Sequence, residues 1–107
     1  MIVSFYKYQG TGNDFIMIDN RSVGLTRSHT AVVKKLCHRH FGIGADGLIL
    51  LNTLSGYDFE MVYYNSDGNE SSMCGNGGRC LVRFAFDRGI KKGKYKFVAV
   101  DGEHEAL

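Results

Sequence analysis

The sequence predicts an α+β domain in which a largely antiparallel mixed sheet wraps around one central helix. Strand-like and helix-like stretches follow one another without the strict alternation of a parallel α/β fold. Several of the strand-like stretches are joined by short polar turns, which suit antiparallel pairs. One of the two helical stretches carries apolar residues around most of its circumference, so we expect the sheet to enclose it almost completely.

The composition limits the classes of protein to which the chain can belong. Its 107 residues suit one domain, and 44% of them are hydrophobic. The absence of proline beside 14 glycines excludes collagen and proline-rich linkers. The net charge of +2 is too small to predict a nucleic-acid partner, and no apolar stretch predicts a membrane span. Three cysteines do not make a disulfide framework, so we expect a cytoplasmic protein with reduced thiols.

The first half of the chain predicts two strands followed by a helix. Ile2–Gln9 alternates in the manner of a strand, and Phe15–Asp19 has the pattern of a short buried strand. Residues 28–40 have helical periodicity, and Gly42 is placed to end the helix in a left-handed conformation. Four residues at helical spacing form its inner face: Val33, Leu36, Cys37 and His40.

The second half predicts two further strands, a tight turn and a hairpin. Leu48–Asn52 and Phe59–Tyr64 are strand-like and are joined by a polar loop. Asp67–Gly68 is a dipeptide that favours a tight turn. Tyr95–Val100 and Glu103–Leu107 are expected to pair as a hairpin across an Asp-Gly turn.

A second helix lies between the tight turn and the hairpin. It is expected to begin near Gly75 and to end at Asp87 or Arg88, where Gly89 stops it. One stripe of this helix is polar and is formed by Arg79, Arg83 and Asp87. Most of the remaining surface is apolar and is formed by Cys80, Leu81, Phe84 and Ala85.

The start of this second helix is the most unusual part of the chain. Three glycines occupy four successive positions after Cys74, although each costs about 1 kcal/mol against alanine inside a helix. Glycines here would let an anionic group approach bare backbone N–H groups at the positive end of the helix. The same dipole favours the thiolate of a cysteine placed just before it. Cys74 is therefore either a reactive thiolate beside an anion site or a bystander in a glycine-rich turn.

The other thiols and histidines have simpler interpretations. Cys80 lies six positions after Cys74, so a helix would turn it about 120° away, toward the core. Cys37, His38 and His40 have metal-ligating side chains, but neighbouring helical positions point about 100° apart. No second ligand cluster with zinc spacing follows them, so no metal site is predicted.

Two asparagines leave a choice between turn and ligand. Asn13 lies in a Gly-Thr-Gly-Asn-Asp loop that matches neither a phosphate loop nor a dinucleotide fingerprint. Its amide could face a ligand, or the residue could adopt a left-handed turn conformation. Asn65, at the end of a predicted strand, leaves the same choice, and the segment Gly42–Gly47 could position a ligand or simply turn the chain.

Four segments of the chain resemble, in order and spacing, the diaminopimelate epimerase family. They are Gly12–Phe15, His40–Gly47, Tyr64–Gly68 and Met73–Cys80, and the last of them reads MCGNGGRC. The resemblance runs over essentially the whole chain. It implies a cofactor-independent isomerase that converts LL-2,6-diaminoheptanedioate to its meso form, a step in lysine and peptidoglycan synthesis.

The resemblance also implies roles for particular residues. In the family mechanism one cysteine thiolate removes the α-proton, and a second cysteine thiol delivers a proton to the opposite face. Cys74 matches the first of these cysteines. Four positions match substrate contacts, namely Asn13, Asn65, Gly75 and Asn76. No pyridoxal cofactor and no metal are implied.

The chain departs from the family pattern in two ways. Gly47 stands where some members carry a glutamine that contacts substrate. The second cysteine of the family lies in a C-terminal domain of similar fold, so we expect residues 1–107 to be the N-terminal domain alone and to be inactive by themselves. The expected partners are the substrate diaminopimelate and that missing C-terminal domain. A homodimer is a further option. The alternatives are half of a proline-racemase-like isomerase, and an anion-binding module without catalysis.

Overall fold

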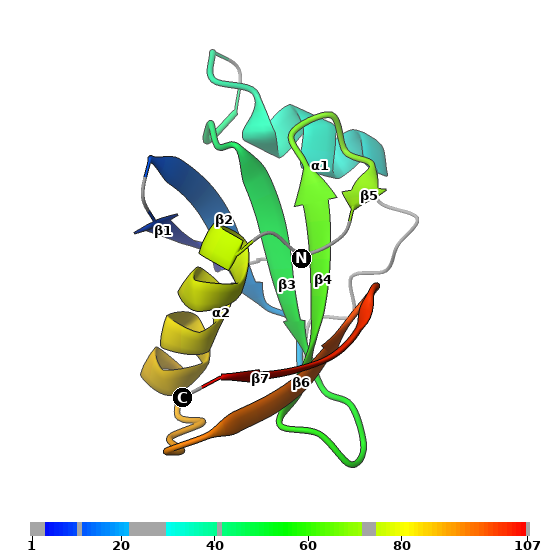
Figure 1. The fold of residues 1–107 in the computed structure, drawn as a ribbon. Coiled ribbons are helices and arrows are strands. Elements are labelled where there is room, and N and C mark those ends of the chain that lie inside the picture. The colour runs from blue at the N-terminus through cyan, green and yellow to red at the C-terminus, as the bar shows by residue number, and fades with distance from the viewer. Residues whose placement is uncertain (1–3, 11, 22–29, 41, 72–74, 107) are drawn as a thin grey trace.

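The computed structural model describes residues 4–10, 12–21, 30–40, 42–71 and 75–106, and their arrangement forms one curved sheet with a helix on each face (Figure 1). The strands are β1 (Tyr6–Gly10), β2 (Asn13–Asp19), β3 (Gly47–Asn52), β4 (Phe59–Asn65), β5 (Glu70–Ser71), β6 (Tyr95–Ala99) and β7 (Gly102–Ala106). The helices are α1 (Thr30–Cys37) and α2 (Gly75–Asp87). The predicted α+β class is therefore confirmed.

The sheet is mixed, and antiparallel pairs outnumber parallel ones. Its order is β1-β2-β3-β4-β6-β7, and β5 pairs with β4 off this path. The parallel pairs are β2 with β3 and β4 with β6. One edge of β4 is shared, because β6 pairs with its first residues and β5 with Tyr63 and Tyr64 near its end. The short β5 has too few residues for a periodic pattern, so sequence reasoning did not identify it.

Each helix packs against one set of alternating side chains from the central strands. The α2 side of β2 and β3 carries Phe15, Met17, Ile49 and Leu51. The α1 side carries the residues between them, Ile16, Ile18, Leu48 and Leu50. Since both faces are covered, these strands are continuously apolar. Hydrophobicity therefore does not tell the two sides of β2 and β3 apart. Only the alternation of successive residues along each strand decides whether a side chain faces α1 or α2.

The helix α2 has the predicted bounds, and its end has a specific hydrogen-bond pattern. The Gly89 N–H donates to the Phe86 carbonyl at 3.1 Å, and the Ile90 N–H donates to the Ala85 carbonyl at 2.9 Å. Gly89 adopts a φ of +100°. This is a Schellman cap, which satisfies carbonyls that the end of a helix leaves unpaired. On the exposed stripe the Arg83 Nε lies 3.3 Å from the Asp87 carboxylate, as the sequence predicts.

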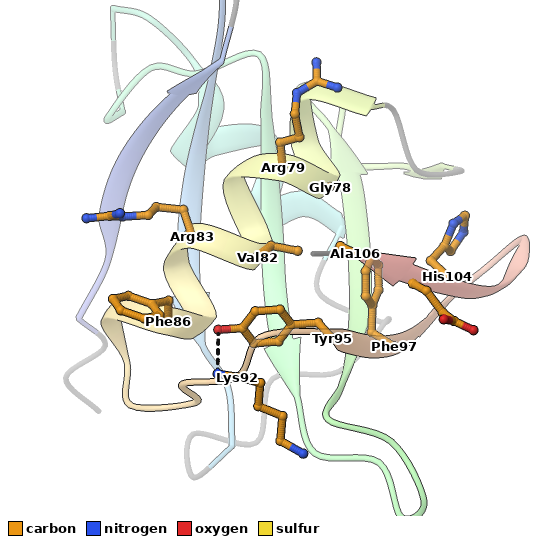
Figure 2. Close-up of a pocket in the computed structure, with 11 residues that line it drawn as sticks. Gly78, Arg79, Val82, Arg83, Phe86, Lys92, Tyr95, Phe97, His104 and Ala106 are labelled. Atoms are coloured by element: carbon orange, nitrogen blue, oxygen red, sulfur yellow. Dashed lines mark hydrogen bonds between the residues drawn. The ribbon is translucent and has the colours of Figure 1, made fainter.

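The sheet buries the predicted apolar side of α2 but leaves part of the helix open. Leu81, Phe84 and Ala85 are fully buried, whereas Phe86 is 40% exposed. Among the described strands β1, β2 and β3 lie closest to α2, and the β6–β7 hairpin of the same sheet stands further off. An open groove of about 510 Å³ lies between the other side of α2 and the β6–β7 hairpin, with Val82 and Tyr95 among its lining residues (Figure 2).

Two predicted boundaries differ from the structure. The first strand begins at Tyr6 rather than Ile2, and residues 1–3 lie outside the described part of the chain. The first helix ends at Cys37 rather than His40, with Val33 and Cys37 buried and His40 exposed. The remaining strands and the hairpin agree with the prediction to within about two residues.

Gly42 is needed for a different reason from the one predicted. It does not adopt the left-handed conformation, which falls instead to Gly44, with a φ of +84°. A Cβ on Gly42 would lie 2.1 Å from the Lys35 carbonyl oxygen, because the chain folds back against the last turn of α1. The N–H groups of Ile43 and Gly44 both donate to the Leu36 carbonyl there. Close backbone approach therefore requires glycine at position 42.

No helix in the described part of the chain is long and apolar enough to cross a membrane.

Candidate active site at the edge of the sheet

Three strand ends and the start of α2 meet at one edge of the sheet. Asn13 begins β2, Gly47 begins β3 and Asn65 ends β4. Gly47 pairs with Phe15 on one side and with Asn65 on the other. Because β2 and β3 are parallel and β4 runs the other way, these residues lie at the same edge.

The strand register also puts these positions on one face. Side chains two residues apart in a strand share a face, so Asn13 shares the face of Phe15, which packs on the α2 side. Gly47 and Asn65 are paired in register with that same row. The two asparagines therefore lie on the side of the sheet where α2 begins.

Asn13 and the first turn of α2 are in direct contact. The Asn76 Nδ2 donates to the Asn13 Oδ1 at 2.7 Å, although the two residues are 63 positions apart. Arg79, one turn further along α2, donates to the Asn76 Oδ1. Gly10 allows this approach, because a Cβ there would lie 3.4 Å from the Asn76 carbonyl oxygen and 3.3 Å from the Cys80 Sγ.

The predicted site residues are only partly brought into contact. Asn13 is a strand residue, and Gly12 takes the left-handed conformation with a φ of +89°, so the turn interpretation of Asn13 is wrong. Asn65 is exposed, and its backbone closes the turn to Asn69. Gly75 is the first residue of α2. Cys74, the predicted catalytic residue, lies outside the described residues.

Gly47 leaves space that a tyrosine ring occupies. A Cβ on Gly47 would lie 3.1 Å from the Tyr63 hydroxyl oxygen and 2.8 Å from the Tyr64 carbonyl oxygen. The Tyr63 ring packs edge-on against Phe15, with 5.9 Å between ring centroids. Any side chain at position 47 would therefore force the Tyr63 ring to move.

A cluster of charges supports the start of β2, and sequence reasoning did not identify it. The Arg39 guanidinium holds both carboxylate oxygens of Asp14, at 2.9 and 3.1 Å. The Lys7 Nζ lies 3.0 Å from the same carboxylate. Hydrogen bonds from Arg39, assisted by Lys7, hold the pKa of Asp14 well below its usual range. Asp14 is thus a fixed carboxylate directly beside Asn13.

Asp46 joins this cluster through a reciprocal pair of hydrogen bonds. The Asp14 N–H donates to the Asp46 Oδ2 at 3.0 Å, and the Asp46 N–H donates to the Asp14 Oδ1 at 3.0 Å. A sequence clue existed, because each aspartate stands at the start of a predicted buried strand. Only the parallel pairing of β2 with β3 makes the two carboxylates neighbours.

The described thiols and histidines do not form a second reactive centre. Cys37, the last residue of α1, is buried against the sheet, and burial raises the pKa of its thiol to about 11. Cys80 is buried against β1, as the sequence predicts. The rings of His38 and His40 lie 5.9 Å apart. No group of three metal-ligating side chains occurs among the residues that the structure describes.

The groove beside β6 and β7 is separate from this edge. None of the predicted substrate contacts lines it (Figure 2). Arg79, which donates to Asn76, does line it. Val82 points from α2 toward Ala106, Arg83 and Phe86 point to the opposite side of the helix, and the Tyr95 hydroxyl accepts a hydrogen bond from the Lys92 N–H. This groove is therefore not the place where the predicted site residues meet.

Comparison with known proteins shows the family of the chain. Residues 5–106 match the family model of diaminopimelate epimerase. The chain belongs to the diaminopimelate epimerase family. It is 64% identical over 104 residues to the diaminopimelate epimerase of Flavobacterium psychrophilum, a match that covers 97% of this chain and 41% of that protein. It is 49% identical over 92 residues to the diaminopimelate epimerase of Alkaliphilus metalliredigens, covering 86% of this chain and 32% of that protein.

The chain thus spans between about a third and two fifths of the length of these two epimerases. Two solved structures share its fold. A PhzF-family phenazine biosynthesis protein of Enterococcus faecalis superposes with a TM-score of 0.75 at 11% identity, covering 98% of this chain and 40% of that one. The corresponding protein of Bacillus anthracis gives a TM-score of 0.69 at 16% identity, covering 96% and 33%. The family resemblance inferred from the sequence is confirmed.

Proposed function

We propose that this chain supplies one side of the active site of a diaminopimelate epimerase. The observation that supports this most directly is the contact between Asn13 and Asn76 at the edge where β2, β3, β4 and the start of α2 meet. This edge brings amide side chains and helix N–H groups together on one face of the sheet. Such groups suit a substrate with an α-carboxylate and an α-ammonium group.

The start of α2 would hold the substrate carboxylate. The first N–H groups of an α-helix have no partner within the helix, and Gly75 and Asn76 are the first two residues of α2. Negative charge that develops on the carboxylate as the α-proton leaves would be stabilised by these N–H groups and by the helix dipole. Asn13 and Asn65 would orient the remaining polar groups of the substrate.

Cys74, which directly precedes Gly75 in the sequence, is the proposed base. Its thiolate would take the α-proton from one face of LL-2,6-diaminoheptanedioate, leaving the electron pair on the α-carbon and its carboxylate. A thiol from the rest of the protein would donate a proton to the opposite face, which gives the meso product. After the step Cys74 is a thiol and the second cysteine is a thiolate. The proposed reaction moves only protons and uses no cofactor. The product would serve lysine and peptidoglycan synthesis in the cytoplasm.

The second cysteine must come from outside this chain in our proposal. Cys37 and Cys80 are both buried. Cys37 packs in the core on the α1 side of the sheet, away from the face of Asn13, and Cys80 is enclosed in the core on the α2 side. We therefore propose that the chain is the N-terminal of two domains and that it cannot invert the substrate without the C-terminal one.

A chimera tests the proposed function. The chain replaces the matching segment of the Flavobacterium psychrophilum epimerase, to which it is 64% identical, and conversion of LL- to meso-diaminopimelate is followed by chiral chromatography. We expect turnover, its loss in Cys74→Ala, and its retention in the control Cys37→Ala. An inactive chimera, or full activity in Cys74→Ala, would contradict the proposal.

The isolated chain provides a second test. We expect it to produce no meso product from the LL substrate, because one face of the α-carbon has no proton donor. Iodoacetamide at neutral pH is expected to label Cys74 much faster than Cys37 or Cys80, which are buried. Equal and slow labelling of all three thiols would favour an anion-binding module instead. Turnover by the isolated chain would refute the two-domain requirement.

A further inference from the structure

The amide of Asn13 has a defined orientation. Its Nδ2 lies 3.4 Å from the Asp46 Oδ2, and its Oδ1 accepts from the Asn76 Nδ2 at 2.7 Å. An ionised carboxylate only accepts hydrogen bonds, so the nitrogen of the amide must be the atom that faces Asp46. Rotating the amide by 180° would bring two oxygens together at one end and two NH₂ groups together at the other.

These contacts form a chain of hydrogen bonds with one direction. Arg79 donates to the Asn76 oxygen, Asn76 donates to the Asn13 oxygen, and Asn13 donates toward the Asp46 carboxylate. A cation therefore stands at the α2 end and an anion at the β3 end, with two amides between them. Each bond polarises the next in such a chain. We call these four residues the amide relay.

Asp46 is itself held in place. Its Oδ2 accepts from the Asp14 N–H at 3.0 Å, and its Oδ1 lies 3.2 Å from an Arg39 nitrogen. The Asp46 N–H donates back to the Asp14 carboxylate. The side chain is 39% exposed, so solvent screens its ion pair with Arg39. What this arrangement supplies is a fixed position for an acceptor rather than a large gain in stability.

We propose that Asp46 is a positioning residue that acts on the substrate through the amide of Asn13. This inference deepens the proposed function and rests on it. With one N–H directed at Asp46, the second N–H of Asn13 remains for an acceptor on the substrate, such as a carboxylate oxygen. Without the carboxylate the amide can rotate, and the substrate would then meet an oxygen where it needs a donor.

A double-mutant cycle in the chimera tests the route through Asn13. We expect Asp46→Asn to lower kcat/KM roughly fivefold, mainly through KM, as expected for one lost hydrogen bond. In the Asn13→Ala background the same change is expected to cost nothing further, because the group on which Asp46 acts is gone. Effects that multiply would overturn the inference.

Asp58 offers a matched control for the loss of a carboxylate. It accepts from the Lys96 N–H at 2.8 Å and pairs with the Lys92 Nζ at 2.6 Å, so it has the same kinds of contact as Asp46. It precedes β4, whose length puts it roughly 20 Å from the Asn65 end of the strand. We expect Asp58→Asn to lower the Tm and to leave kcat/KM unchanged. An equal fall in kcat/KM would mean that Asp46→Asn acts through stability alone, which would overturn the inference.

A measurement on the 107-residue chain is independent of turnover. The side-chain NH₂ signals of Asn13 are recorded by ¹H–¹⁵N NMR in the wild type, Asp46→Asn and Asp58→Asn. We expect Asp46→Asn to shift the Asn13 pair and to speed its exchange with solvent about tenfold, while Asp58→Asn leaves it unchanged. Unaltered Asn13 signals in Asp46→Asn would overturn the inference. An inactive chimera would refute the proposed function, whereas this measurement would still decide the role of Asp46.

Discussion

Replacing Gly10 by alanine measures how closely β1 approaches the start of α2. The added Cβ would lie 3.3 Å from the Cys80 Sγ and 3.4 Å from the Asn76 carbonyl oxygen. The contact with the Cys80 Sγ is tight, so α2 must give way there by a few tenths of an ångström, whereas 3.4 Å is an ordinary van der Waals distance. Overpacking of this kind costs about 1–3 kcal/mol. Gly10 does not have a positive φ, so alanine fits its backbone conformation. Alanine also restricts the unfolded chain, which raises the free energy of unfolding by about 0.4–1 kcal/mol and offsets part of the loss.

The net loss is therefore about 1 kcal/mol, which lowers the Tm of a domain of this size by about 4 °C. Thermal unfolding followed by circular dichroism gives this value for Gly10→Ala. The same substitution in a Cys80→Ala background lacks the nearer of the two contacts, so we expect a Tm loss there of less than about 1 °C. Equal losses in the two backgrounds would refute the packing argument. In the chimera, Gly10→Ala is also expected to raise KM, because Asn76 moves with α2.

Three further predictions concern acid stability, thiol protection and the start of β3. Ion pairing lowers the pKa of Asp14 in the folded chain, so the unfolded chain binds a proton there first and stability is lost below about pH 4. Asp14→Asn should make the free energy of unfolding, measured by urea titration, fall less steeply below this pH. An unchanged pH dependence would contradict this. Burial raises the pKa of Cys37 to about 11, two units above its ordinary value, so Cys37 should react with iodoacetamide at pH 7.5 about 100-fold more slowly in the folded chain than in urea. Comparable rates would exclude the buried position. Gly47→Ala should lower the Tm, because the new Cβ would clash with Tyr63, whereas Gly93→Ala should not, because the space around its Cβ is open. Equal Tm shifts in the two variants would contradict the clash.

Local patterns predicted the elements whose signals lie within a few residues. The bounds of α2 follow from its apolar spacing and from Gly89, and the β6–β7 hairpin follows from two strand-like stretches around an Asp-Gly turn. The position of Asn65 at the end of a strand could also be anticipated. These predictions succeed because a cap or a tight turn depends on the conformation of two or three residues.

Features that depend on distant parts of the chain could not be predicted in this way. The role of Gly42 follows from a backbone that folds against Lys35, and the exposure of Phe86 follows from how far the sheet curves around α2. The neighbouring carboxylates of Asp14 and Asp46 require the parallel pairing of β2 with β3. Sequence spacing carries no information about such pairings, so the amide relay became visible only in the structure.

The contact between Asn13 and Asn76 also bears on how the protein acquires its site. It joins residues 63 positions apart, and at the other end of α2 the hydrogen bond between Tyr8 and Asp87 joins residues 79 positions apart. Contacts with such long sequence separation form late and slowly in folding, because the entropy of closing the loop must be lost before they form. During synthesis the chain reaches Asn13 early, yet the donor to its Oδ1, Asn76, is added 63 residues later with α2. We therefore expect the contact between Asn13 and Asn76 to be among the last in this domain to become ordered.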